Sequence, residues 1–206
     1  ANPPYIRQEE IVKYKERLKQ KYTIYNSTSD IYTYFFELSK SLLNKNGTGV
    51  FITSNKWMRA KYGKNLRVFF KDKLLINELM NFGENHVFEN AVTNTNITIF
   101  ENKDKSDQII EYSELKKEEK IDNLNNYFLN NKIPILKKSL DVENFYFLDD
   151  SNQNLYSKLV AKGNPLKKLP YKIYYGIKTA FNEAFLVSTE TKKLIIQKNQ
   201  KCKKFF

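Results

Sequence analysis

A short, nearly continuous apolar run at Gly49–Thr53, which follows an amphipathic segment, constrains the fold most strongly. Such a run is typical of a strand buried in a parallel sheet. The preceding residues Ile31, Phe35, Leu38 and Leu42 recur at helical spacing, and they predict a helix with that stripe buried. A helix followed by a buried strand is half of a βαβ unit, so the sequence predicts an α/β fold.

Other segments extend this prediction along the chain. The apolar spacing predicts helices over 6–22, 58–71 and 115–129, and strands over 74–82 and 97–101. The two strands are close enough in sequence to form an antiparallel pair at a sheet edge. Apolar content returns from Ile133, and the composition changes near Gly163, which places a domain boundary between about 135 and 165.

The charge and the rare residues narrow the class of protein. Lys and Arg number 35 against 23 Asp and Glu, a net charge of +12, which fits either a nucleic-acid partner or a solvated basic surface. One cysteine, Cys202, excludes an internal disulfide framework, and one histidine, His86, argues against a His-rich metal site or a His-based triad. No signal peptide or membrane-span pattern is present, so a cytoplasmic protein is expected, and no metal ligands are assigned.

The tetrapeptide Asn2-Pro3-Pro4-Tyr5 carries the most specific chemistry. Its prolines fix an extended turn, which suits a loop at the carboxyl end of a strand, where open α/β sheets bind ligands. The Asn2 side-chain oxygen and the Pro3 carbonyl are two acceptors for the hydrogens of an exocyclic adenine amine. The Tyr5 ring offers a face for a base removed from its stack. An ordinary Pro-Pro turn before a helix is the alternative.

Several motifs in order resemble those of amino-group DNA methyltransferases. Asn2–Tyr5 is similar to the catalytic motif of that family, and Ser29–Tyr32 with Phe35 is similar to its next motif. Val87–Ala91 resembles the motif whose Phe stacks on the flipped adenine. The resemblance implies catalytic roles for Asn2, Pro3 and Tyr5, base stacking by Tyr5 and Phe88, and contact of Phe35 with S-adenosylmethionine. Phe35 and Phe88 are also explained as core positions.

Two further stretches resemble parts of type IIG restriction–modification enzymes. Residues 54–67 are similar to the segment after the buried strand, and their cations, Lys56 and Arg59 among them, are candidates for DNA contact. Residues 174–185 are similar to the opening of a TaqI-like specificity domain, with DNA contacts expected from Lys178, Thr179 and Asn182. A solvated helix and a fold-supporting role are the respective alternatives.

The resemblance implies an α/β fold that forms the carboxyl half of a Rossmann-like methyltransferase sheet with an antiparallel edge pair. Residues 1–110 are expected to be the methyltransferase part, 111–162 a helical connector and 163–206 the start of the recognition domain. The expected function is adenine-N6 methylation of double-stranded DNA within a site-specific enzyme.

The main motifs for S-adenosylmethionine are not found, so the chain is expected to be a fragment that is inactive alone. An incomplete sheet suggests a homodimer through an exposed edge. The alternatives are a non-catalytic DNA-binding module and an RNA or protein methyltransferase. The pairs Asp149-Asp150 and Asp72-Lys73 are too common in a charged chain to indicate a nuclease centre.

Overall fold

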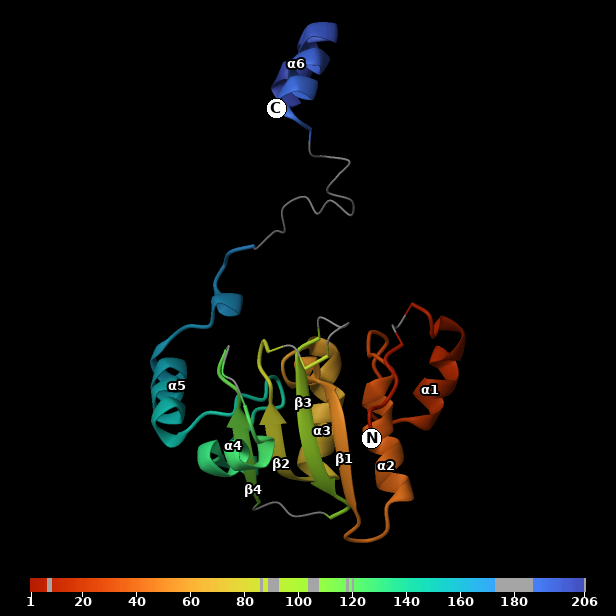
Figure 1. Ribbon diagram of the computed structural model, residues 1–206, viewed down its shortest axis with the longest axis vertical. Helices are drawn as coiled ribbons and strands as arrows, with labels where there is room; N and C mark the ends of the chain where they lie inside the picture. Colours follow the sequence, from red (N-terminus) through yellow and green to blue (C-terminus); the bar gives the residue numbers. More distant parts are fainter. Residues whose placement is uncertain are drawn as a thin grey trace. The chain divides into compact units, whose positions relative to one another are not determined.

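The computed structural model describes residues 1–6, 9–85, 87–88, 93–103, 108–117, 119, 121–172 and 187–205. The chain forms two compact units, Ala1–Lys158 and Leu159–Phe206. The first unit contains the sheet and the Asn2–Tyr5 loop, and helices lie against the sheet (Figure 1). The mixed α/β class predicted from the sequence is therefore confirmed.

The elements follow one another in a mixed order along the chain. The strands are β1 (Thr48–Ser54), β2 (Leu75–Asn81), β3 (Thr95–Glu101), β4 (Ile109–Glu114) and β5 (Ile133–Leu136). The α-helices are α1 (Lys15–Lys21), α2 (Tyr32–Leu42), α3 (Lys64–Asp72), α4 (Leu124–Asn131), α5 (Asp150–Lys162) and α6 (Thr189–Lys198). Short 3-10 helices are η1 (Val12–Tyr14), η2 (Asn55–Met58), η3 (Lys61–Gly63), η4 (Lys137–Ser139), η5 (Leu166–Lys168) and η7 (Gln200–Phe205). None of the helices in the described ranges has the length and apolarity that crossing a membrane requires.

The five strands lie in the order β1-β3-β2-β4-β5. Strands β2 and β4 are parallel, whereas β1–β3, β2–β3 and β4–β5 are antiparallel. The expected antiparallel pair of β2 and β3 is present, but β3 also pairs with β1, so this pair lies inside the sheet. Strands β1 and β5 are the outer strands of the described part, and dimerisation through a sheet edge stays a prediction.

Strand β1 differs from the fully buried parallel strand that the sequence predicted. Its one strand neighbour in the described ranges is β3, and its side chains alternate, with Phe51 buried and Val50 46% exposed. Ala1 lies along the other side of β1, where its nitrogen donates to the Val50 carbonyl (2.6 Å) and its carbonyl accepts from the Ile52 amide (3.0 Å). This is the hydrogen-bond pattern of a parallel pair.

The main core lies between the sheet and helices α2 and α3. Phe36 of α2 is fully buried, and its ring centroid lies 5.0 Å from that of Phe51, 5.0 Å from that of Phe70 and 5.6 Å from that of Phe100. A smaller cluster on Met80, Phe82, Leu115 and Phe128 packs α4 against the sheet. Aromatic edges and faces thus join helices α2 and α3 to strands β1 and β3.

The buried face of α2 is not the predicted one. Tyr32 and Phe36, four residues apart, are buried, whereas Ile31 and Phe35 are half-buried and Leu42 is 74% exposed. Aromatic residues occupy both faces of this helix, so spacing alone did not identify the face that meets the sheet. The helix ends before Asn46, which has a positive φ of 65° in the turn into β1.

Two other predicted helices are shorter than expected. In place of 6–22, the described residues form only η1 and α1, and in place of 58–71 the chain forms η2, η3 and then α3. Ala60 is extended, with a ψ of 149°, which interrupts the helix between η2 and η3. The predicted helix over 115–129 starts later, at Leu124, where Asn123 caps it by accepting from the Asn126 amide (3.0 Å).

The expected division of the chain into functional domains stays a prediction. Strand β4 runs across the expected limit at residue 110, and Leu159, not residue 163, begins the second compact unit. In that unit, Ser188 caps α6 by accepting from the Thr191 amide (3.1 Å), and α6 buries none of its residues.

We predict that Phe36→Ala lowers the free energy of unfolding by about 3–5 kcal/mol, because it empties the centre of the main core. Leu42→Ala on the same helix should change it by less than about 0.5 kcal/mol, because that side chain is already in solvent. Urea denaturation followed by circular dichroism measures both. Equal effects of the two substitutions would contradict the assignment of the buried face.

Candidate functional site

The Asn2–Tyr5 loop leaves the sheet at the carboxyl end of β1. Ala1 pairs with β1 in the parallel sense, so Asn2 and the residues after it continue toward Ser54. Pro3 is buried, while Asn2 and Pro4 are exposed. The loop thus starts beside the carboxyl end of β1, and its role in ligand binding stays a prediction.

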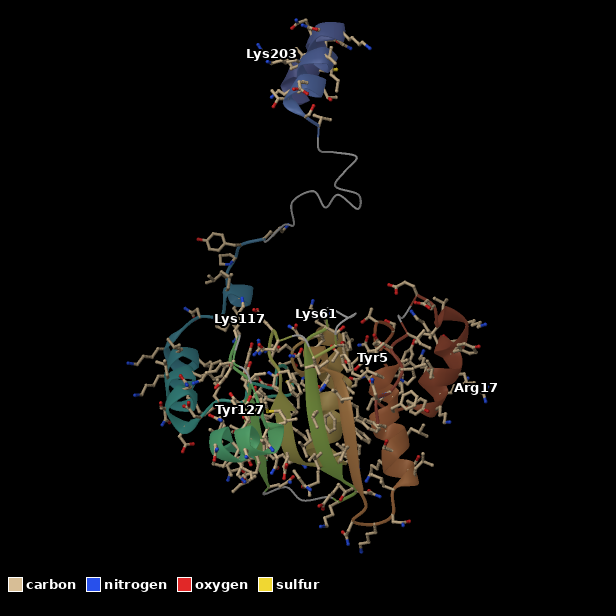
Figure 2. All side chains as sticks on the ribbon, in the orientation of Figure 1. Tyr5, Arg17, Lys61, Lys117, Tyr127 and Lys203 are labelled. Carbon is tan, nitrogen blue, oxygen red and sulfur yellow. The ribbon has the colours of Figure 1, made fainter. Side chains whose placement is uncertain are left out.

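Tyr5 is fixed although its ring is 42% exposed. Its ring centroid lies 5.3 Å from that of the buried Tyr32, with the two planes tilted by 43°. Burial raises the pKa of the Tyr5 phenol, and a hydrogen bond from the backbone of Ser54 lowers it by a smaller amount. Figure 2 shows Tyr5 toward the same end of the first unit as Lys61 and Lys117. A half-exposed ring supported from behind is a suitable platform for a planar ligand.

Asp30 holds the far end of the loop. Its Oδ1 accepts a hydrogen bond from the Ile6 amide (3.2 Å), and the Ile31 amide donates to the Ile6 carbonyl (3.4 Å). Burial raises the pKa of Asp30, and the backbone amides of Ile6, Tyr32 and Ile31 and the charge of Lys56 lower it. The carboxylate therefore joins the loop to the start of α2.

A second tyrosine contact joins α2 to η3. The hydroxyls of Tyr32 and Tyr62 lie 3.1 Å apart, and the Ser29 hydroxyl donates to the Tyr62 carbonyl (3.4 Å). Burial raises the pKa of Tyr32 well above its usual value and raises that of Tyr62. Both phenols therefore stay protonated near neutral pH, and they support Tyr5 without adding charge.

The other predicted site residues are distributed over several elements. Phe35 lies on α2, half-buried and packed against the main core, and Phe88 is partly exposed in the connection from β2 to β3. Lys56 on η2 and Arg59 directly after it are both exposed. The charge of Lys56 acts on Asp30 at the end of the loop. Lys178, Thr179 and Asn182 lie outside the described residues.

Sequence reasoning gave no role to Asp30, Tyr32 or Tyr62, although the first two stand in a motif that it singled out. The only available signal was an acidic residue just before a helix start, which more often indicates a cap. Within the basic segment 54–67, Arg67 does not face solvent. It is buried and donates to four backbone carbonyls, so it is unsuited to phosphate contact.

The sequence of the chain is similar to those of known restriction–modification proteins. The family described as Eco57I restriction-modification methylase matches residues 1–88, which include the loop, Asp30 and Phe88. Type II methyltransferase M.BstVI of Geobacillus stearothermophilus is 34% identical over 97 residues, which are 45% of this chain and 17% of that protein. Type II restriction enzyme and methyltransferase RM.Eco57I of Escherichia coli is 26% identical over 193 residues, 90% of this chain and 19% of that protein.

The fold has a counterpart among solved structures. The type IIL restriction–modification enzyme MmeI, solved in complex with DNA, superposes with a TM-score of 0.61 at 17% identity, over 99% of this chain and 26% of that one. The prediction of a Rossmann-like methyltransferase fold fragment is therefore confirmed. The chain resembles restriction–modification methyltransferases in particular, and it spans 17% and 19% of the length of the two curated relatives.

We predict that Asp30→Ala speeds hydrogen exchange of the Ile6 amide by about tenfold, because it removes a charged acceptor. Asp30→Asn keeps a side-chain oxygen at that position and should leave the exchange near the wild-type rate. Exchange followed by NMR measures both rates. A slow Ile6 amide in Asp30→Ala would show that the carboxylate does not hold the loop.

The raised pKa of Asp30 also gives a pH dependence. Because the folded pKa lies above the unfolded one, the folded protein binds the proton more tightly, and this contribution to stability is lost as pH rises through the folded pKa. The Asp30→Asn variant has no carboxyl group to titrate at this position. Its free energy of unfolding minus that of the wild type should therefore increase from acidic to neutral pH. Urea unfolding across that range measures the difference, and a difference independent of pH would contradict the effect of burial.

Proposed function

We propose that the loop Asn2–Tyr5 binds the exocyclic amine of an adenine, and that the protein acts in site-specific adenine-N6 methylation of DNA. The observation that carries this proposal is the fixed position of the loop. Ala1 anchors its start to β1, Asp30 holds its end through Ile6, and the Asn2 side chain remains exposed between them. The match of residues 1–88 to a restriction–modification methylase family supports the same function.

The chemistry needs two acceptors rather than a strong base. The lone pair of the adenine amine is delocalised into the ring, which makes the nitrogen a weak nucleophile. The Asn2 side-chain oxygen and the Pro3 carbonyl would each accept a hydrogen bond from one N–H of the amine. These two bonds would favour a tetrahedral, more nucleophilic nitrogen. Catalysis would then depend on orientation and the exclusion of water, with no covalent enzyme intermediate.

Tyr5 would stack on the adenine after it leaves the duplex, a step that costs a few kcal/mol. The tilted contact with Tyr32 supports the Tyr5 ring from behind. Phe88 would cover the opposite face of the base. Its partial exposure in the β2–β3 connection suits that role.

Phe35 is our candidate for contact with the adenine ring of S-adenosylmethionine. It is half-buried between the buried Tyr34 and Phe36, which suits a ring that packs on the core and offers part of its surface. When bound, the cofactor supplies an electrophilic methyl group. Among the described residues, those of the Asn2–Tyr5 loop would orient the adenine nitrogen that receives the methyl group.

The DNA partner and the wider type IIG assignment belong to the same proposal. Lys56 and Arg59 would contact phosphate, and Lys178, Thr179 and Asn182 would contact DNA from the segment expected to begin the recognition domain. The connector over 111–162 would join the two parts. The +12 charge of the chain supports a polyanionic partner.

We predict that the chain binds a duplex with one adenine opposite an abasic site at least about tenfold more tightly than the paired duplex, because the unpairing energy is already spent. Purine at that position, which lacks the amine, should lose this preference. Asn2→Ala should lose it too, whereas Asn130→Ala on the exposed side of α4 should keep it. Fluorescence anisotropy measures the affinity of each protein for these duplexes.

The outcomes separate the proposal from its alternatives. An Asn2→Ala variant that still prefers the unpaired adenine would contradict the role of the loop. Equal binding of paired and unpaired duplexes by the wild type would favour a non-catalytic DNA-binding module. Stronger binding of structured RNA than of either duplex would favour an RNA methyltransferase.

A further inference from the structure

A cavity of about 980 Å³ opens beside η2, at the end of the sheet where β2 and β4 finish. Asn55 of η2 and Arg59 directly after η2 line it, together with Asn81 and Tyr112 from the strands and Tyr146 from the segment before α5. These residues all belong to the first compact unit. We call this cavity the η2 cleft.

A chain of polar side chains crosses the wall of the η2 cleft. The Asn55 amide donates to the Asn81 side-chain oxygen (2.9 Å), the Asn81 amide donates to the Tyr112 hydroxyl (3.2 Å), and that hydroxyl donates to Glu114 (2.6 Å). Burial raises the pKa of Tyr112 well above its usual range, so the phenol remains a donor. The ring of Tyr112 stacks on Phe147 with centroids 4.4 Å apart and planes 7° apart. The direction of each hydrogen bond is therefore fixed.

This chain leaves hydrogen-bonding capacity for a ligand. The Asn55 side-chain oxygen has no hydrogen-bond partner among the residues that the structure describes, and each of the two amides uses one of its two hydrogens. The Asn81 oxygen already accepts from Asn55 and from the Gly83 amide (3.2 Å). An acceptor beside amide hydrogens matches a base edge with adjacent donor and acceptor, such as that of adenine.

Cations outnumber acids in the lining of the η2 cleft by four to three: Lys56, Arg59, Lys116 and Lys117 against Glu84, Glu114 and Asp149. Glu84 pairs with Lys117 (3.6 Å), Glu114 accepts from Tyr112, and Asp149 accepts from the Asn152 amide (2.8 Å). Arg59 is exposed and lies over the Tyr146 ring, 5.8 Å from its centroid, and Lys116 is also exposed. Cations beside a 37% exposed tyrosine ring suit a phosphate attached to a planar base.

The η2 cleft adjoins the loop through consecutive residues. The backbone of Ser54 hydrogen-bonds Tyr5, and the next residue, Asn55, forms part of the wall of the cleft. Lys56 lines the cleft as well, and its charge acts on Asp30 at the end of the loop. A DNA strand that places a base on Tyr5 therefore has its neighbouring nucleotides within reach of the cleft.

We infer that the η2 cleft binds a nucleotide next to the target adenine in the same DNA. Asn55 and Asn81 contact the edge of its base, Tyr146 contacts the base face, and Arg59 with Lys116 contacts its phosphate. The inference rests on the proposed function, since it needs DNA on the loop. It adds a second reading position that lies in the first compact unit.

The test compares Arg59→Ala with Lys61→Ala, which removes a nearby exposed cation that does not line the cleft. In binding to the duplex with the unpaired adenine, Arg59→Ala should lower the affinity about tenfold and reduce the slope of log affinity against log salt by about 1. Lys61→Ala should lower the affinity less than about twofold. Equal losses in the two variants would overturn the inference.

A second arm replaces the neighbours of the unpaired adenine, one at a time, with abasic nucleotides. Wild type should lose affinity at one neighbouring position, and Asn55→Ala should be insensitive there. If no position matters, or if free deoxyadenosine monophosphate binds while Arg59→Ala leaves DNA affinity intact, the cleft serves another ligand. Arg59→Ala and Asn55→Ala should both keep the preference for the unpaired adenine. If the wild type itself lacks that preference, the result contradicts the proposed function and not the nucleotide site.

Discussion

The buried guanidinium of Arg67 is the interaction on which the arrangement of the site depends. It donates to the carbonyls of Trp57 and Ala60 on one side and to those of Val142 and Glu143, about 75 residues later, on the other. Burial lowers the pKa of Arg67, and four partly charged carbonyls replace the water that it loses. The interrupted segment η2–η3 is thus fastened to the chain that leads to α5.

Both proposed sites rely on that fastening. The segment η2 carries Lys56, whose charge lowers the pKa of Asp30 at the end of the Asn2–Tyr5 loop, and Asn55, which lines the η2 cleft. The Phe145 amide donates to the Met58 carbonyl (2.9 Å), so the opposite wall of the cleft is attached to the same short helix. A shift of η2 would therefore change both the charge beside Asp30 and the wall of the η2 cleft, which would couple the two proposed sites.

The sequence predicted the features that depend on local stiffness. Two consecutive prolines determine the extended loop, and its place at a strand end follows from the α/β pattern. The buried face of α2 could not be predicted, because aromatic residues surround the helix and only packing on Phe51 and Phe100 selects Phe36. The same holds for Arg67 and Asp30. Whether a charged residue meets solvent or a buried backbone group depends on residues brought close by the fold, such as Val142 and Ile6.

In the proposed function, Asn2 orients an adenine amine for methylation. Mass spectrometry of nucleosides, from the DNA of a host that expresses the natural protein containing residues 1–206, tests it most directly. We expect N6-methyladenine with the wild-type sequence and none with Asn2→Ala, while both proteins accumulate equally. N6-methyladenine that persists in Asn2→Ala, or methylation confined to cytosine, would contradict it.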